Sequence, residues 1–492
     1  MDATIPRTGP PGEPSVSEAR ALKGLVDAIE ARNPAPGALV RLVAPAAGVD
    51  PWALLAEASS KGQPVFAWSD GREGQTILGV GVAAQIDAAG ASRFDDASAA
   101  CSRWREELCD IPIDGLITPP MLAWAGFSFF AQEPAPRSRW AAWGQGRAVV
   151  PRAMIFAQGA LGGIAIATRR LEGQSAAALA LDLMTQLSAL RDDIERAPVA
   201  DHLDAEQDLE GAAVPGEGER DEERWGERVE RATADIQAQI AHKIVLARSI
   251  TLRAQAGRHF ALASTMERLR RDHGGAFVFC IGSGDQGFFL GATPEALVRK
   301  RGARVSAQVL AGTAPRGETP EEDAAIGHAL MESGKDRREH ALTAEAIEGA
   351  LSSFCRALRV ANKPRLALLR DVQHLETPVE GVLAEAVDVL KLVGALHPTP
   401  AVGGLPRESA LQWIRAHEGL ERGWYAGPIG WVGAEGDGAF AVAIRSALVQ
   451  ADEAEAFAGA GLVTGSVPER EWRETRLKLE TASRALSTAV IP

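Results

Sequence analysis

The sequence predicts an α+β sandwich, in which two antiparallel β-sheets pack together and helices cover the outside. Of the 492 residues, 46% are apolar, which is ample for a large buried core. Residues 64–84 contain two strand-like runs joined by an Asp-Gly turn, as expected for neighbouring antiparallel strands. Apolar residues recur at helical spacing over 225–240, and the strand-like run 243–252 follows directly.

Composition divides the chain into four stretches. Residues 1–20 are rich in Pro, Gly and Ser and lack the apolar core of a signal peptide, so we expect a disordered tail. Residues 21–198 alternate short apolar runs with turn signals. The acidic stretch 199–224 is typical of an exposed linker, although part of it is compatible with a helix. Residues 225–492 carry the sharper motifs and are expected to hold the functional site.

The charge balance excludes several partners. Lys and Arg number 52 against 65 Asp and Glu, which gives a net charge of −13, so we expect no nucleic-acid or anionic-membrane binding. The uncharged stretch near 115–132 contains Pro119 and Pro120, which favours a loop entering a buried strand over a membrane span. The four scattered cysteines fit no disulfide framework and are typical of reduced thiols in a cytoplasmic protein.

The segment GSGDQG at 282–287 matches the glycine pattern of dinucleotide-binding loops. Such a loop must open a helix, whose N-terminus receives the pyrophosphate. Here another strand-like run, 288–292, follows the glycines. We therefore predict a β-hairpin turn and reject a nucleotide site.

Two predicted helices, 333–354 and 465–486, carry carboxylates in their first turns. Acidic residues there ordinarily complement the helix dipole, and Glu–Lys pairs one turn apart are common on surfaces. The alternative is that the two helices meet and hold a hard cation such as Mg²⁺, which needs only one or two carboxylates besides water and substrate. The acidic residues concerned are Asp336, Glu339, Glu471 and Glu474.

The sequence allows two structural roles for each of three isolated charged residues. Lys243, at a helix–strand junction, is either a solvated cation or a half-buried general base. Glu295 follows Pro294 and either opens a helix or faces a site. Arg445 stands inside an apolar strand pattern, so it needs a buried carboxylate or an anionic ligand as its partner.

Taken together and in order, these segments resemble the chorismate-utilising enzymes, which include isochorismate synthases, salicylate synthases and the large subunits of anthranilate and aminodeoxychorismate synthases. The resemblance covers essentially all of 225–492, and residues 21–198 resemble the family's more variable N-terminal half. The family's two-sheet sandwich agrees with the fold class above. The matching segments are KIVLAR (243–248), GATPEALVR (291–299), LAGTAPRG (310–317), SGKDRREH (333–340), VQHLETPVEG (372–381), LHPTPAVGG (396–404), WYAGPIGW (424–431), AVAIRSAL (441–448) and GAGLVTGSVPEREWRETRLKLE (459–480).

The resemblance implies a role for each matching residue. Glu339 and Glu474 would hold Mg²⁺, with Asp336 and Glu471 close to it. The other implied residues contact chorismate, a dicarboxylate: Tyr425, Arg445 and Lys478 at its carboxylates, His374 beside the ring, and Gly312, Thr313, Gly459 and Gly461 in the pocket wall. Arg can bind a carboxylate through two hydrogen bonds and so fix its orientation.

The resemblance also assigns the proton transfers. In isochorismate formation, water adds at C2 and the C4 hydroxyl leaves, so one group must accept a proton and another must donate one. Lys243 matches the family's base and Glu295 its acid. Lys243 must therefore be neutral, and Glu295 protonated, before the reaction.

Two positions choose among the members of the family. Ammonia-using members generally carry Gln at the position of Lys243, so water is the expected nucleophile and no glutamine amidotransferase partner is expected. Salicylate synthases typically carry Thr where this chain has Ala401. The sequence is therefore interpreted as a monomeric isochorismate synthase of menaquinone or siderophore biosynthesis. The alternatives are a salicylate synthase and a catalytically inactive, metabolite-binding homologue.

Overall fold

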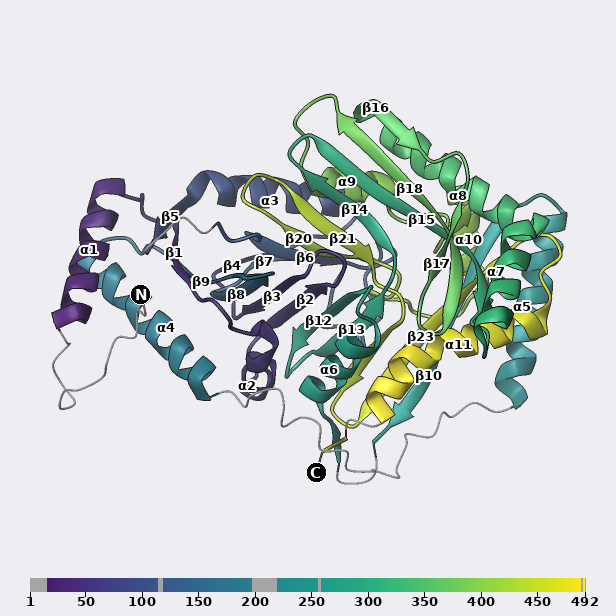
Figure 1. Cartoon of the computed structure of the whole chain (residues 1–492), viewed down its shortest axis with the longest axis horizontal. Helices are drawn as coiled ribbons and strands as arrows, with labels where there is room; N and C mark the ends of the chain where they lie inside the picture. Colours follow the sequence, from purple (N-terminus) through teal and green to yellow (C-terminus); the bar gives the residue numbers. More distant parts are fainter. Residues whose placement is uncertain (1–15, 114–117, 197–218, 255–257, 488–489, 492) are drawn as a thin grey trace.

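The computed structural model describes residues 16–113, 118–196, 219–254, 258–487 and 490–491. Two large β-sheets pack together, and helices cover their outer faces and edges (Figure 1). The predicted α+β sandwich is therefore confirmed. Within the described ranges, no helix is long and apolar enough to cross a membrane.

The larger sheet has twelve strands, and its neighbours are antiparallel except for the pair β1 and β5. Its order is β19 (Gly404–Leu405), β10 (Lys243–Arg253), β23 (Glu453–Leu462), β22 (Ser446–Gln450), β13 (Gly287–Thr293), β12 (Phe277–Ser283), β2 (Val65–Asp70), β3 (Gln75–Val80), β8 (Ala153–Gln158), β9 (Leu161–Arg169), β1 (Leu39–Pro45) and β5 (Leu108–Pro112). The predicted pair within 64–84 is β2 and β3, and 282–287 is the turn of the β12–β13 hairpin.

The second sheet has ten antiparallel strands. Its order is β16 (Cys355–Val360), β18 (Val372–Leu383), β15 (Arg304–Pro315), β14 (Ala296–Arg301), β21 (Gly438–Val442), β20 (Pro428–Val432), β6 (Ala123–Phe127), β7 (Gly146–Val150) and β4 (Ala84–Asp87), with β17 (Arg365–Leu368) also paired to β18. A short pair, β11 (His259–Phe260) and β24 (Val490–Ile491), lies apart from both sheets.

Strand side chains alternate between two cores, because successive residues of a strand face opposite sides. In β2, Phe66 and Trp68 enter the core shared by the two sheets, whereas Val65 and Ala67 enter the core between the larger sheet and its covering helices. Both sheets mix strands from 21–198 and 225–492, as in the pairs β2–β12 and β6–β20. The two stretches therefore share their cores.

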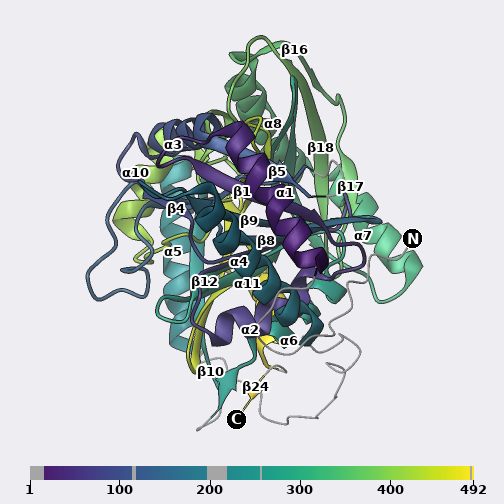
Figure 2. The ribbon, with the colours of Figure 1, turned by 90° about the vertical axis from the view of Figure 1, so that its left-hand side faces the viewer.

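The helices form the outer layer of the molecule. In Figure 2, α1 and α4 lie in front of the larger sheet, while α8 packs against the second sheet. The helices are α1 (Val16–Arg32), α2 (Leu55–Ser60), α3 (Arg93–Glu107), α4 (Ala176–Arg196), α5 (Glu219–Gln237), α6 (Leu262–Asp272), α7 (Pro320–Glu332), α8 (Gly334–Ser352), α9 (Val389–Leu396), α10 (Arg407–His417) and α11 (Pro468–Ser487).

Two expected boundaries differ from the structure. Helix α1 begins at Val16, inside the expected tail 1–20, because the run EARALK consists of strong helix formers. Residues 1–15 lie outside the described residues. Of the expected linker 199–224, residues 199–218 also lie outside them, and the remainder forms the start of α5.

Candidate active site

A cavity lies where β10 and β23 of the larger sheet approach β15 and β18 of the second sheet, closed by α8 and α11. Most of the site residues expected from the sequence line it, although they come from distant parts of the chain. These are Glu295, Gly312, Thr313, Asp336, Glu339, His374, Ala401, Tyr425, Arg445, Gly459, Gly461, Glu474 and Lys478. The two others, Lys243 and Glu471, contact lining residues through ion pairs with Glu339 and Lys335.

Lys243 is the first residue of β10, and its side chain is 1% exposed. Its Nζ lies 2.9 Å from Oε1 of Glu339 and donates to Oγ1 of Thr343 at 3.5 Å. The burial excludes the solvated-cation reading. A buried ammonium needs a partner, and Glu339 supplies it. The contacts with Glu339 and Thr343 hold the amine in place at the start of β10.

Glu295 lies between β13 and β14, and a strand follows it, so the helix-opening reading is excluded. Its side chain is buried and accepts a hydrogen bond from Oγ1 of Thr399 at 3.5 Å. Burial raises the pKa of Glu295 to about 7, although the charges of Lys243 and Lys478 act in the opposite direction. The carboxyl is therefore protonated at neutral to mildly acidic pH, as a general acid requires.

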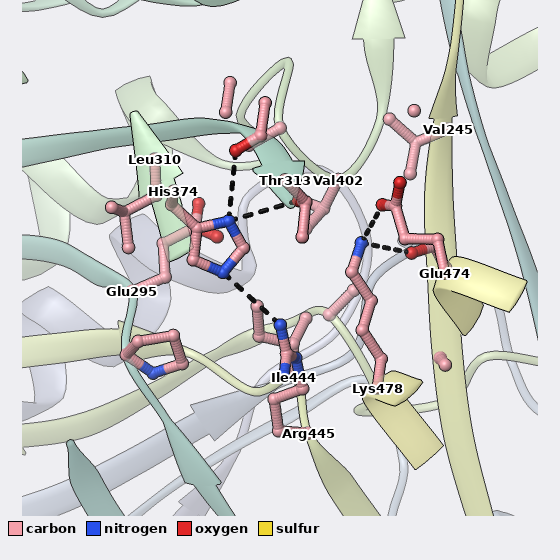
Figure 3. A pocket seen from close by; sticks show the side chains of 18 of the residues that line it. Val245, Glu295, Leu310, Thr313, His374, Val402, Ile444, Arg445, Glu474 and Lys478 are labelled. Atoms are coloured by element: carbon pink, nitrogen blue, oxygen red, sulfur yellow. Dashed lines mark hydrogen bonds and ion pairs between the residues drawn. The ribbon is translucent and has the colours of Figure 1, made fainter. Parts of the chain in front are cut away.

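Arg445 and His374 form one polar contact across the cavity (Figure 3). Nη2 of Arg445 lies 3.4 Å from Nε2 of His374, and Nδ1 of His374 lies 3.2 Å from the carbonyl oxygen of Gly312. Since guanidinium only donates, Nε2 must accept and Nδ1 must carry the proton. Burial, aided by the charges of Arg445 and Lys478, lowers the pKa of His374 to about 3, so this histidine is neutral.

Helix α11 supplies a lysine and two carboxylates to the site. Lys478 pairs with Glu474 one turn earlier and donates to the carbonyl oxygen of Gly459 at 2.9 Å (Figure 3). Glu471 is 3% exposed and pairs with Lys335 at 3.2 Å. Burial and then the charge of Glu474 raise the pKa of Glu471 to about 6.

Asp336, Glu339 and Glu474 line one side of the cavity with carboxylate oxygens, which are suitable ligands for a hard cation. Burial raises the pKa of Asp336, and the negative charges of Glu339 and Glu474 add to this shift. The carboxylates of α8 and α11 therefore lie close enough to repel one another. Oxygen donors of this kind suit Mg²⁺, which keeps several waters. Among the described residues, no group of three or more His, Cys, Asp or Glu side chains is already arranged around a metal position. A cation would therefore have to displace the lysines that now pair with Glu339 and Glu474.

The pocket wall is held close by glycine. A Cβ on Gly461 would lie 2.7 Å from Oε1 of Glu339 and 3.1 Å from Cε of Lys243. A Cβ on Gly459 would lie 3.2 Å from the hydroxyl of Tyr425, whose ring stacks on Phe457. Only glycine leaves these polar groups room at the strand surface.

Sequence reasoning missed three groups that support the site. Thr399 contacts the carboxyl of Glu295, and Thr343 contacts Lys243. Arg422 lines the cavity and pairs with Glu418, where both side chains are 1% exposed. A Glu and an Arg four residues apart look like an ordinary surface pair in the sequence, so only burial distinguishes this one.

Comparison with known proteins identifies the family of this chain. The sequence profile of the chorismate binding enzyme family matches residues 25–487. The chain is 37% identical to the salicylate biosynthesis isochorismate synthase of Pseudomonas aeruginosa, over 83% of this chain and 82% of that protein. It is 33% identical to isochorismate synthase MenF of Bacillus subtilis, over 86% of this chain and 87% of that protein.

A solved structure, that of the menaquinone-specific isochorismate synthase MenF from Escherichia coli, matches with a TM-score of 0.73 and 25% identity. The match covers 95% of this chain and 99% of that one. Since the family profile spans nearly the whole described fold, this chain belongs to the chorismate binding enzyme family.

Proposed function

We propose that this chain is an isochorismate synthase, which adds water at C2 of chorismate and releases the C4 hydroxyl. The observation that carries the proposal is that one site contains both a buried lysine, Lys243, and a separate buried carboxyl, Glu295, whose pKa is about 7. The names of the relatives at 33–37% identity support the same activity.

Chorismate brings two carboxylates into a protein of net charge −13, so local cations must hold it. Arg445 and Lys478 line the cavity and provide the positive charge, with the hydroxyl of Tyr425 beside them. His374, on β18 of the second sheet, contacts the guanidinium of Arg445 and, being neutral, adds no charge of its own. These residues bind and orient the substrate.

Lys243 acts as the base that takes a proton from water, and Glu295 acts as the acid that protonates the departing hydroxide. Each such proton transfer contributes about 10²–10⁴-fold to the rate. With a pKa of about 7, Glu295 holds its proton at mildly acidic pH and about half of the time near pH 7. The role of Lys243 requires its neutral amine.

Mg²⁺ is the proposed cofactor, with Glu339 and Glu474 as its ligands and Asp336 and Glu471 nearby. When bound, the ion would neutralise and orient a substrate carboxylate between these acidic groups. We further propose a cytoplasmic monomer without an amidotransferase subunit, since a lysine base serves water rather than ammonia. Product use in menaquinone or siderophore biosynthesis belongs to the same proposal.

The test is chromatographic identification of the products formed from chorismate with and without Mg²⁺. Isochorismate alone supports the proposal. Salicylate with pyruvate would replace it by a salicylate synthase, and anthranilate formed with ammonia would contradict the role of Lys243. Chorismate that binds but stays unchanged would leave only a metabolite-binding role. The Glu295→Gln variant is the control that ties any product to this cavity.

A further inference from the structure

The Glu418–Arg422 pair follows helix α10 and is almost completely enclosed. Nε and Nη2 of Arg422 donate to the two carboxylate oxygens of Glu418 at 2.7 and 2.5 Å. The guanidinium also stacks over the ring of Phe129, 4.2 Å from its centroid. A buried ion pair by itself adds little stability compared with apolar residues of similar size, so its position in the fold is the informative feature.

The pair joins two segments that carry reacting groups. Arg422 donates to the carbonyl oxygen of Val245, two residues after Lys243, and to that of Val402, directly after Ala401. Glu418 in turn accepts from the amide of Ala247 on the same strand, at 2.8 Å. The start of β10 and the 399–403 loop are therefore fastened to one guanidinium–carboxylate unit.

The Glu418–Arg422 pair is also connected to the proposed acid, Glu295, and to the substrate-binding residue Tyr425. The 399–403 loop begins at Thr399, which donates to Glu295. The carbonyl oxygen of Arg422 accepts from the amide of Tyr425 at 2.9 Å. In contrast, Arg445 and Lys478, which provide the positive charge for the substrate, are held by other residues, namely His374, Glu474 and Gly459.

We propose that Arg422, held by Glu418, is a positioning residue that sets the distance between the base Lys243 and the Thr399 contact of the acid Glu295. This rests on the proposed function. The charge of Arg422 is balanced by Glu418, and its Nε, Nη1 and Nη2 donate to oxygens of the protein, so Arg422 acts through other residues. Misplacement of a reacting group by about 1 Å can cost about 10²-fold in rate.

The test removes both charges together, in Arg422→Met/Glu418→Leu, because removal of one partner would leave a buried charge unpaired. We expect a folded variant with a lower melting temperature, because the amide of Ala247 and the carbonyl oxygens of Val245 and Val402 lose these partners. Its KM for chorismate should stay close to the wild-type value, with kcat reduced at least tenfold. Arg422→Lys keeps the charge but not the planar fork, and should recover part of kcat. A matched control is Arg484→Met/Glu480→Leu, an exposed pair with the same spacing on α11, which should leave kcat unchanged.

A wild-type kcat in the folded double variant would overturn the proposal, and so would a parallel loss of kcat and substrate affinity. If the double variant does not fold, Arg422→Lys and Glu418→Gln provide the same comparison of kcat with KM. Amide hydrogen exchange over 243–247 and 399–405 gives a readout independent of turnover. We expect faster exchange there in the variant, and unchanged exchange would contradict the positioning role even if the wild-type protein made a different product.

Discussion

Nζ of Lys243 lies 2.9 Å from the carboxylate of Glu339, so the proposed base and a proposed metal ligand form one buried ion pair. Two further lysine–glutamate pairs involve α11: Lys478 pairs with Glu474 within the helix, and Lys335 of α8 pairs with Glu471. Each lysine balances a carboxylate that has lost most of its contact with water. The site is thus electrically compensated before it meets a dianionic substrate or a divalent cation.

Replacement of the base should remove turnover. In Lys243→Met the alkyl stem stays but no amine can accept a proton, so kcat should fall about 10²–10⁴-fold. Isochorismate formation followed by chromatography measures this, and Lys363→Met on the exposed surface is the control. Undiminished turnover would falsify the assignment of Lys243.

Glu295→Gln should lose turnover and gain stability at pH 8. The carboxyl has a pKa of about 7 in the folded protein against an ordinary value of 4.5, so the unfolded chain ionises first. The folded state is therefore penalised increasingly as pH rises from 4.5 to 7, by about 3 kcal/mol in total, and glutamine avoids this penalty. Urea unfolding at pH 8 should show the gain. At pH 4.5 and below, the gain should vanish; an equal gain at both pH values would contradict the titration of Glu295.

The titration of Glu295 should also appear in the pH dependence of kcat/KM. Because the acid must be protonated, kcat/KM should fall as pH rises through about 7. His374, whose pKa is about 3, contributes no step above pH 5. A rate profile from pH 5 to 9 measures the fall, and the residual activity of Glu295→Gln should lack it. A wild-type profile that stays flat across this range would exclude Glu295 as the acid.

If Glu474 is a ligand of Mg²⁺, replacement of a glutamate on α11 should affect the Mg²⁺ requirement less the farther that glutamate lies from the metal. Glu474→Gln removes a ligand charge, so the Mg²⁺ concentration needed for half-maximal activity should rise at least tenfold. Glu471→Gln should have a smaller effect, and Glu469→Gln, exposed in the first turn of the same helix, should have none. Titration of activity with Mg²⁺ and calorimetry on the chorismate complex measure the series. Equal responses of all three variants would argue against a localised site.

Gly461→Ala should lower activity without unfolding the protein. The added methyl group meets Glu339 Oε1 and Lys243 Cε, which are far ends of flexible side chains, so the ion pair moves rather than the backbone. We expect kcat to fall at least tenfold, while the melting temperature changes by a few degrees at most. Gly349→Ala in α8, where a methyl group meets nothing, should be neutral or stabilising by about 1 kcal/mol. Wild-type kcat in Gly461→Ala would show that the pair does not need its present geometry.

Local patterns predicted much of the fold and the candidate site. The hairpin turn at 282–287, the helices that carry Glu339 and Glu474 and the strand beginning at Lys243 follow from periodicity and turn residues close in sequence. The roles of individual residues entered only through the order of the motifs. Pairings between distant segments, such as Lys243 with Glu339, cannot be read from spacing. Burial is equally invisible, which is why the Glu418–Arg422 pair and the contact of Thr399 with Glu295 were missed.

The interleaving of early and late strands has a consequence for biosynthesis. Strand β2 pairs locally with β3, and β6 pairs with β7, but the other edge of each stays unpaired until β12 and β20 have been made. Helix α11, with Glu474, covers the larger sheet last of all. Such non-local pairing slows folding and leaves apolar edges exposed meanwhile. A nascent chain therefore stays incompletely packed and prone to aggregation until α11 has been synthesised, which makes chaperone protection during synthesis valuable.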